Sequence, residues 1–98
     1  MSSASGVATR RVRILNAKGL HARPAAAVSR AAQGYDAAVT LSHGSETADA
    51  RSIMDLLLLV AVPGSEVEIR AEGADADAAV EAVAQLFNDG FGELDPPG

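Results

Sequence analysis

Hydrophobic and polar residues alternate along two segments of the chain, and this alternation predicts two half-buried β-strands. Residues 11–15, RVRIL, place Val12 and Ile14 on one face of an extended segment and arginines on the other. Residues 66–71, EVEIRA, alternate in the same way. One face of each strand should therefore be buried.

Two shorter strand candidates form a predicted hairpin. Residues 37–41 and 47–50 flank the sequence SHGS at residues 42–45, whose composition is typical of a turn. We therefore interpret His43 as a turn residue.

Two longer segments have the pattern of amphipathic helices. Residues 22–33 are rich in alanine, with Pro24 in the first turn, where proline is tolerated, and Gly34 directly after the end. A second helix is predicted to start at Asp75 and to end at Gly90. Its apolar residues recur at the spacing of one helix face: Ala76, Val80, Val83, Ala84 and Phe87.

A short helix is predicted between these two. Ser52 and Asp55 have the spacing of a capping box, with aspartate in place of the usual glutamate or glutamine. The apolar run that follows stops before Pro63-Gly64.

These elements occur in the order β-α-β-β-α-β-α, which predicts an α+β fold of two layers. We expect a four-stranded, mostly antiparallel sheet with the three helices on one face. The folded domain should span residues 10–92, with a disordered N-terminal tail at residues 1–9 and a C-terminal tail at residues 93–98.

Composition excludes several classes of protein. The longest apolar run, residues 56–62, is far shorter than the roughly 20 residues of a membrane span. With no cysteine and two histidines in no ligand-like spacing, a metal site is not expected. A net charge of −5 and only three aromatic residues argue against a nucleic-acid partner.

Charge is unevenly distributed along the chain. Residues 1–35 hold six basic residues and no acidic one, whereas residues 36–98 hold thirteen acidic residues against Arg51 and Arg70. Such an asymmetry occurs by chance in small domains, but it also fits a basic region around His21 that attracts an acidic partner or a phosphate.

The sequence GLHARPAA at residues 19–26 carries the strongest chemical signal. His21 lies where the first long helix begins, and the first N–H groups of a helix lack partners within it and bind anions. Neutral imidazole is a nucleophile. Arg23 can donate charge-assisted hydrogen bonds to a phosphate on that ring. Gly19 permits the preceding turn, and Pro24 fixes the start of the helix.

GLHARPAA closely resembles the active-centre motif of the HPr family, the histidine-containing phosphocarrier proteins of the phosphotransferase system. The likeness extends from Arg10 to Gly92 and includes ARSIMDLL and PGSEVEIRAEG. It implies an open-faced β-sandwich and a cytoplasmic monomer without a cofactor. Such a protein is a stoichiometric carrier, not an enzyme, which accepts a phosphoryl group from Enzyme I and passes it to an EIIA-type protein.

The resemblance also implies roles for individual residues. His21 would be phosphorylated on Nδ1, with Arg23 as its charge partner and the Ala22 and Arg23 N–H groups facing the phosphate. Ser52 aligns with the serine that HPr kinase/phosphorylase modifies in some relatives, although serine is also simply a favoured helix cap. Partner docking is expected at Arg30, Ile53 and Met54, of which we expect Met54 to be the exposed one of the two apolar neighbours.

The branch of the family and the class of function both have alternatives. LFNDGFGE at residues 86–93 resembles the C-terminus of the nitrogen-related paralogue NPr, which favours a regulatory role over a sugar-transport HPr. A small-molecule-binding regulatory module could use the same fold without needing His21. An interaction domain that has lost phosphotransfer is disfavoured by the intact motif. A self-sufficient enzyme is disfavoured because no catalytic pairing is evident near His21.

Overall fold

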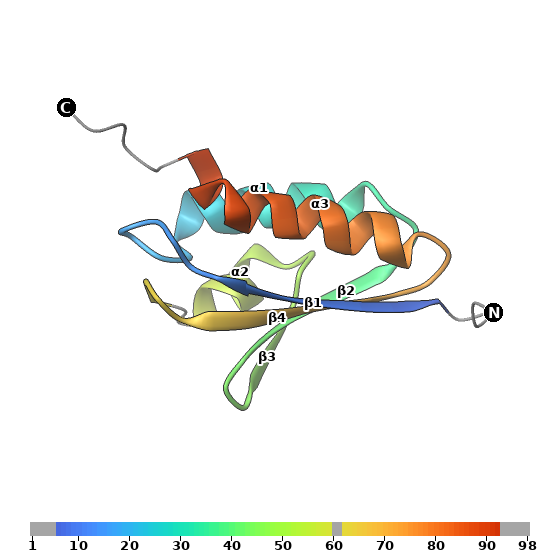
Figure 1. Ribbon diagram of the computed structural model, residues 1–98, viewed down its shortest axis with the longest axis horizontal. Coiled ribbons are helices and arrows are strands. Elements are labelled where there is room, and N and C mark those ends of the chain that lie inside the picture. Colours follow the sequence, from blue (N-terminus) through green and yellow to red (C-terminus); the bar gives the residue numbers. More distant parts are fainter. Residues whose placement is uncertain (1–5, 60–61, 93–98) are drawn as a thin grey trace.

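One four-stranded sheet forms the base of the molecule (Figure 1). The computed structural model describes residues 6–59 and 62–92. The strand order is β1-β4-β2-β3, and every neighbouring pair is antiparallel, so the predicted α+β architecture is confirmed. The strands are β1 (Val7–Arg13), β2 (Ala38–His43), β3 (Glu46–Asp49) and β4 (Glu66–Glu72).

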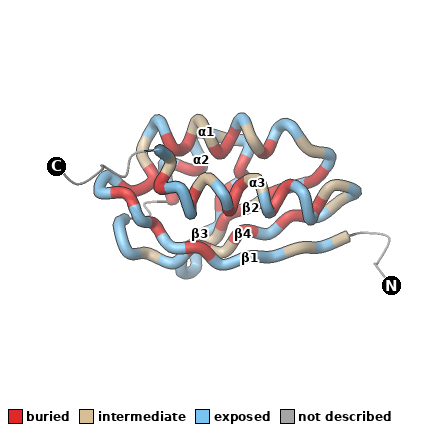
Figure 2. Tube along the Cα trace, turned by 45° about the horizontal axis from the view of Figure 1, so that its top comes forward, coloured by how far each residue is buried: buried red, intermediate tan, exposed pale blue. Residues whose placement is uncertain are grey.

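Three α-helices cover one face of this sheet, and the other face is left open. They are α1 (Ala22–Gln33), α2 (Ile53–Leu58) and α3 (Ala76–Asn88), and a short 3-10 turn, η1 (Gly90–Gly92), follows α3. In Figure 1, α1 and α3 lie above the strands, and the buried positions face the space between helices and sheet in Figure 2. Within the described residues, no helix is both long and apolar enough to cross a membrane.

The core joins alternate strand residues to one stripe of each helix. The predicted apolar face of α3 is confirmed, since all five of its members are buried. The sheet contributes Val12, Val39, Leu41, Val67 and Ile69, and α1 contributes Val28 and Ala32. The helix boundaries at Ala22 and Gln33 also match those predicted.

The first strand begins and ends earlier than the predicted residues 11–15. It runs from Val7 to Arg13, so the expectation that residues 7–9 belong to the disordered tail is wrong. Arg10 explains why the alternation was missed, because this arginine lies on the helix side and forms an ion pair with Glu81 of α3. Ile14 remains buried beyond the strand end. Residues 1–5 and 93–98 of the expected tails lie outside the described residues.

The hairpin is tighter than predicted, and the interpretation of His43 as a turn residue is wrong. His43 pairs with Glu46 in the β2–β3 ladder, which leaves only Gly44 and Ser45 as the turn. Gly44 has φ +62°, a conformation that glycine adopts without the strain of a side chain. The ring Nδ1 of His43 lies 3.4 Å from the carbonyl oxygen of Leu59, at the end of α2.

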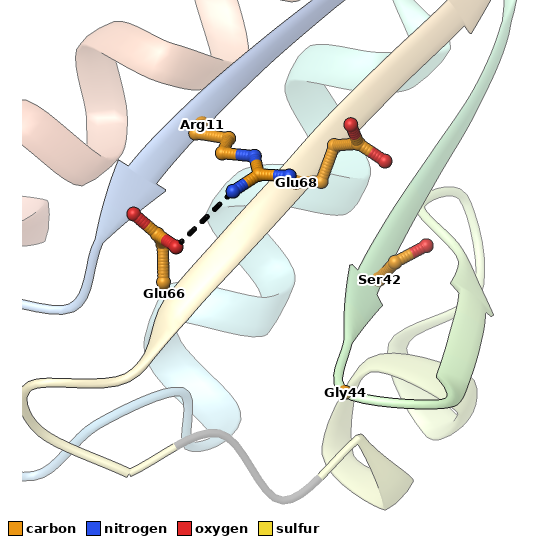
Figure 3. Close-up of a pocket in the computed structure, with 5 residues that line it drawn as sticks. All are labelled: Arg11, Ser42, Gly44, Glu66 and Glu68. Carbon is orange, nitrogen blue, oxygen red and sulfur yellow. Dashed lines mark ion pairs between the residues drawn. The ribbon is translucent and has the colours of Figure 1, made fainter.

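Ion pairs on the open face of the sheet use part of the basic N-terminal segment. Arg11 and Arg13 of β1 lie 3.5 and 3.8 Å from carboxylate oxygens of Glu66, and Figure 3 shows the Arg11 pair beside Glu68. Because Arg10 is also paired, three of the six N-terminal cations stabilise the sheet and its contact with α3. Lys18, Arg23 and Arg30 are the other three.

Candidate functional site

A tight loop between β1 and α1 positions the start of α1. Asn16 is fully buried, and its Nδ2 donates a hydrogen bond to the carbonyl oxygen of Gly19 at 2.8 Å. The N–H of Gly19 donates back to the carbonyl of Asn16 at 3.2 Å. Gly19 has φ +67°, so the chain reverses there in a conformation that disfavours side chains. The loop thus fixes the position of His21 at the helix start.

His21 is the N-cap residue of α1, as predicted. Its backbone is extended, with φ −103° and ψ −165°, and its carbonyl accepts the first helical hydrogen bond from Ala25 at 2.9 Å. Its own N–H donates to Gly19, and its imidazole does not cap the helix. The His21 side chain is partly exposed, so it lies at the surface beside the helix start.

Two backbone N–H groups of α1 are left for an external acceptor. A helix normally begins with N–H groups that have no acceptor inside it. Here Pro24 has no N–H, which leaves those of Ala22 and Arg23, both exposed residues. The first turn holds no acidic side chain that would compete for them or oppose an anion. The geometry next to the His21 ring therefore favours an anion such as a phosphate.

Basic side chains lie on α1 and in the loop before it. Arg23 is exposed, and the ion pairs found within residues 6–59 and 62–92 do not involve it. The same holds for exposed Lys18 and for Arg30, in the last turn of α1. The structure thus leaves these three cations available to an anionic ligand or an acidic surface.

The second predicted site lies at the start of α2. Ser52 is the N-cap, and its Oγ accepts a hydrogen bond from the N–H of Asp55 at 3.1 Å, which confirms the cap. The reciprocal half of a capping box is replaced, because the Ser52 N–H donates to the carbonyl of Asp49. Ser52 is partly exposed.

A buried hydroxyl connects α1 to this cap. Ser29 is buried on α1, and its Oγ donates to the carbonyl oxygen of Arg51 at 2.8 Å. Gln33, one turn later, donates from Nε2 to the same Oγ at 3.0 Å. This link fixes the start of α2 relative to α1. Ser29 and Asn16 were not predicted from the sequence, because a polar residue in a helix or loop pattern gives no signal of burial.

Both apolar neighbours at the start of α2 are exposed, so the expectation that only one would point outward is wrong. Ile53 is 43% and Met54 69% exposed, and Leu57 and Leu58 are exposed as well. Within Ile53–Leu58, Leu56 is the buried residue, because a helix of six residues has room for little more than one inward position. Leu57 and Leu58 were missed since an unbroken apolar run does not reveal which members face solvent.

Groups of three or more potential metal-ligating side chains are not found among the described residues. The features near His21 are a nucleophilic ring, two helix N–H groups and an exposed guanidinium. These can hold and exchange an anionic group on the imidazole.

Comparisons with known proteins point to the same chemistry. The family model described as the phosphorylation site of the HPr component of the phosphotransferase system matches residues 8–89. The phosphocarrier protein HPr of Treponema pallidum (strain Nichols) is 42% identical over 82 residues, which are 84% of this chain and 93% of that protein. The phosphocarrier protein NPr of Escherichia coli (strain K12) is 42% identical over 83 residues, 84% of this chain and 92% of that protein.

Solved structures extend the likeness to three dimensions. The crystal structure of HPr-C-His from Thermoanaerobacter tengcongensis superimposes with a TM-score of 0.84 at 32% identity. The match covers 89% of this chain and 98% of the other.

We predict that Asn16→Ala destabilises the fold by about 1–3 kcal/mol, since it removes a buried hydrogen bond and leaves a small cavity under the loop. Urea unfolding followed by circular dichroism measures this as a lower midpoint at an unchanged slope. Lys18→Ala, an exposed change in the same loop, serves as the control and should leave the midpoint in place. Equal midpoints for the two variants would contradict the role given to Asn16.

Proposed function

The chain belongs to the HPr family of phosphocarrier proteins of the phosphotransferase system, and on this premise we propose that His21 carries its phosphoryl group on Nδ1. The observation that carries the proposal is the position of His21 as N-cap of α1, beside the N–H groups of Ala22 and Arg23. Pro24 supports it by removing the next N–H and fixing the first turn.

The proposed reaction is a transfer between two histidines. As Nδ1 of His21 forms a bond to phosphorus, the bond between phosphorus and the ring nitrogen of the donor breaks, and its electron pair returns to the donor ring. Phosphoryl transfer passes through a loose transition state with charge on the equatorial oxygens, so it depends mainly on positioning and charge stabilisation. The Ala22 and Arg23 N–H groups and the Arg23 guanidinium supply that stabilisation.

The donor in this proposal is phospho-Enzyme I, charged by phosphoenolpyruvate, and the acceptor is a histidine of an EIIA-type protein. The protein then acts as a stoichiometric carrier in the cytoplasm, as a monomer, and is not itself an enzyme. Exposed Arg30, Ile53 and Met54 are the proposed docking contacts, since α2 packs against α1 and thus lies beside the helix that carries His21.

We place the protein in the nitrogen-related branch, with a nitrogen-type Enzyme I and EIIA as partners. The sequence at residues 86–93 supports this choice. In the structure, Phe91 packs edge to face on Phe87 with ring centroids 4.8 Å apart, so this segment closes the end of α3. The 42% identities to an HPr and to an NPr do not separate the two branches, and a sugar-transport HPr is the alternative.

Replacement of His21 by alanine should abolish phosphorylation without unfolding the protein. The reason is that the His21 ring is partly exposed and does not cap α1. Phosphoenolpyruvate and purified Enzyme I should add one phosphate to the wild type, measured by intact mass, and acid should remove it. His21→Ala should show no added mass and an unchanged circular dichroism spectrum.

The matched control is His43→Ala, which removes the other histidine and should still accept one phosphate. Parallel reactions with sugar-type and nitrogen-type Enzyme I test the branch. If neither donor phosphorylates the wild type, the carrier proposal fails and the ligand-binding module becomes the better explanation.

For Arg23→Ala we predict transfer about tenfold to a hundredfold slower, because a charge-assisted contact to the phosphate is lost. Rapid-quench measurement of His21 phosphorylation gives the rate. Arg70→Ala removes an exposed arginine from the open sheet face and should react at the wild-type rate. Unchanged kinetics in Arg23→Ala would eliminate the proposed role.

We also propose Ser52 as a regulatory phosphorylation site. Its hydroxyl lies at a helix start, where added negative charge is tolerated, although Asp55 would lie close to the new phosphate. ATP and an HPr kinase/phosphorylase should give an acid-stable phosphate at residue 52 by tandem mass spectrometry. Ser45, exposed in the hairpin turn, is the internal control, and modification there alone would contradict the assignment.

A further inference from the structure

A groove of about 200 Å³ lies between β3 and α2. Glu46 and Thr47 of β3 form one side, and Asp55, Leu58 and Leu59 form the other. Both carboxylate residues are exposed, Leu58 is 69% exposed, and Leu59 is buried. The groove therefore combines acidic groups with an apolar wall.

The two carboxylates of the groove are not neutralised by the ion pairs found among the described residues. Those pairs join Arg10, Arg11, Arg13 and Arg70 to Glu66, Glu72 and Glu81, all elsewhere on the molecule. His43 is the cross-strand partner of Glu46, but its ring Nδ1 lies against the carbonyl oxygen of Leu59. Glu46 and Asp55 thus present two negative charges to solvent at one place.

The residues that line the groove indicate which kind of ligand it can bind. A metal ion is disfavoured, because the described residues hold no cluster of three or more ligating side chains here or elsewhere. An arginine or lysine side chain suits both walls, since its aliphatic stem packs on leucine while its charged end meets the carboxylates. Met54, one turn before Leu58 on α2, extends the apolar rim and is equally exposed.

We infer that this groove receives an arginine or lysine side chain of the protein partner that docks on α2 to exchange the phosphoryl group with His21. The inference rests on the function proposed above and adds a condition on the partner. Lys18 and Arg23 near His21, together with Arg30 in the last turn of the same helix, favour acidic groups along α1, whereas the groove requires a basic group beside the apolar contact. Two patches of opposite charge fix the orientation of the partner. They also disfavour partner proteins whose docking surface carries only positive or only negative charge.

The test is a double charge reversal, Glu46→Lys with Asp55→Lys. The side-chain change leaves in place the capping hydrogen bond that the Asp55 backbone N–H donates to Ser52 Oγ. Phosphotransfer is measured from phospho-Enzyme I of both types and onward to EIIA. For the partner that uses the groove, KM should rise about tenfold or more while kcat stays within about twofold, because encounter is weakened and the chemistry is not. The rise in KM should shrink as salt is added.

The matched control is Asp36→Lys with Asp77→Lys, which changes the net charge equally. Both positions are exposed and lie at the end of the molecule where α1 has ended and α3 begins. This control should keep the wild-type KM. If the groove variant unfolds, Glu46→Gln with Asp55→Asn replaces it, with an expected KM rise of about threefold.

The outcomes separate the two proposals. A wild type that takes no phosphate from either donor overturns the carrier function and the groove with it. A wild type that is phosphorylated, with a groove variant of unchanged KM toward every partner, overturns the groove alone. An equal KM rise in groove and control variants also overturns it, since net charge would then be the cause.

Discussion

The proposed phosphoryl site depends on the backbone N–H groups at the start of α1, which have no hydrogen-bond acceptor inside the helix. Such groups must find water, a side chain or a ligand. In this chain His21 supplies no side-chain cap and Pro24 removes one donor, so the N–H groups of Ala22 and Arg23 remain for an external acceptor. The buried hydrogen bond between Asn16 and Gly19 keeps this helix start in place. The sheet supports the same loop, because Ile14 is bonded to Gly64 and Ser65 on the neighbouring connection.

The fold divides the charges of the chain between structural and surface roles. Three N-terminal arginines are held by carboxylates of β4 and α3, where exposed pairs contribute only modest stability. The other three N-terminal cations lie on or next to α1, with Lys18 and Arg23 within three residues of His21 and Arg30 in the last turn of the helix. Acidic residues are left beside α2, on the neighbouring surface. A sequence tally of charge could show the asymmetry between the two halves, but only the pairing shows which charges are available.

Sequence periodicity predicted most of the fold, and its failures have physical causes. The faces of α1 and α3 were predictable because twelve and thirteen residues give several turns of repeated spacing. The start of β1 was not, since Arg10 faces the helix layer through an ion pair and breaks the apolar alternation. The predicted boundary between β2 and the hairpin turn was wrong, because a histidine is found at the end of a strand as well as in a turn. The pairing order β1-β4-β2-β3 follows from contacts between segments distant in sequence, which local patterns do not encode.

The candidate site was predictable to the extent that its chemistry is local. His21, Arg23 and Pro24 lie in one short motif, and the cap at Ser52 follows from spacing alone. The contributions of Asn16 and Ser29 were hidden, because burial of a polar side chain depends on elements packed from elsewhere. The exposure of both Ile53 and Met54 could not be predicted for a related reason, because the sequence of a short apolar helix does not show which of its residues are buried and which are exposed to solvent.

The most direct test of the central claim is an NMR comparison of the phosphorylated and unphosphorylated protein, with ¹⁵N in the backbone and in both histidine rings. The account predicts a phosphorus–nitrogen coupling at Nδ1 of His21 and the largest amide shifts at Ala22 and Arg23. A phosphate on Nε2 of that ring or on His43, or unshifted amides at the start of α1, would contradict it.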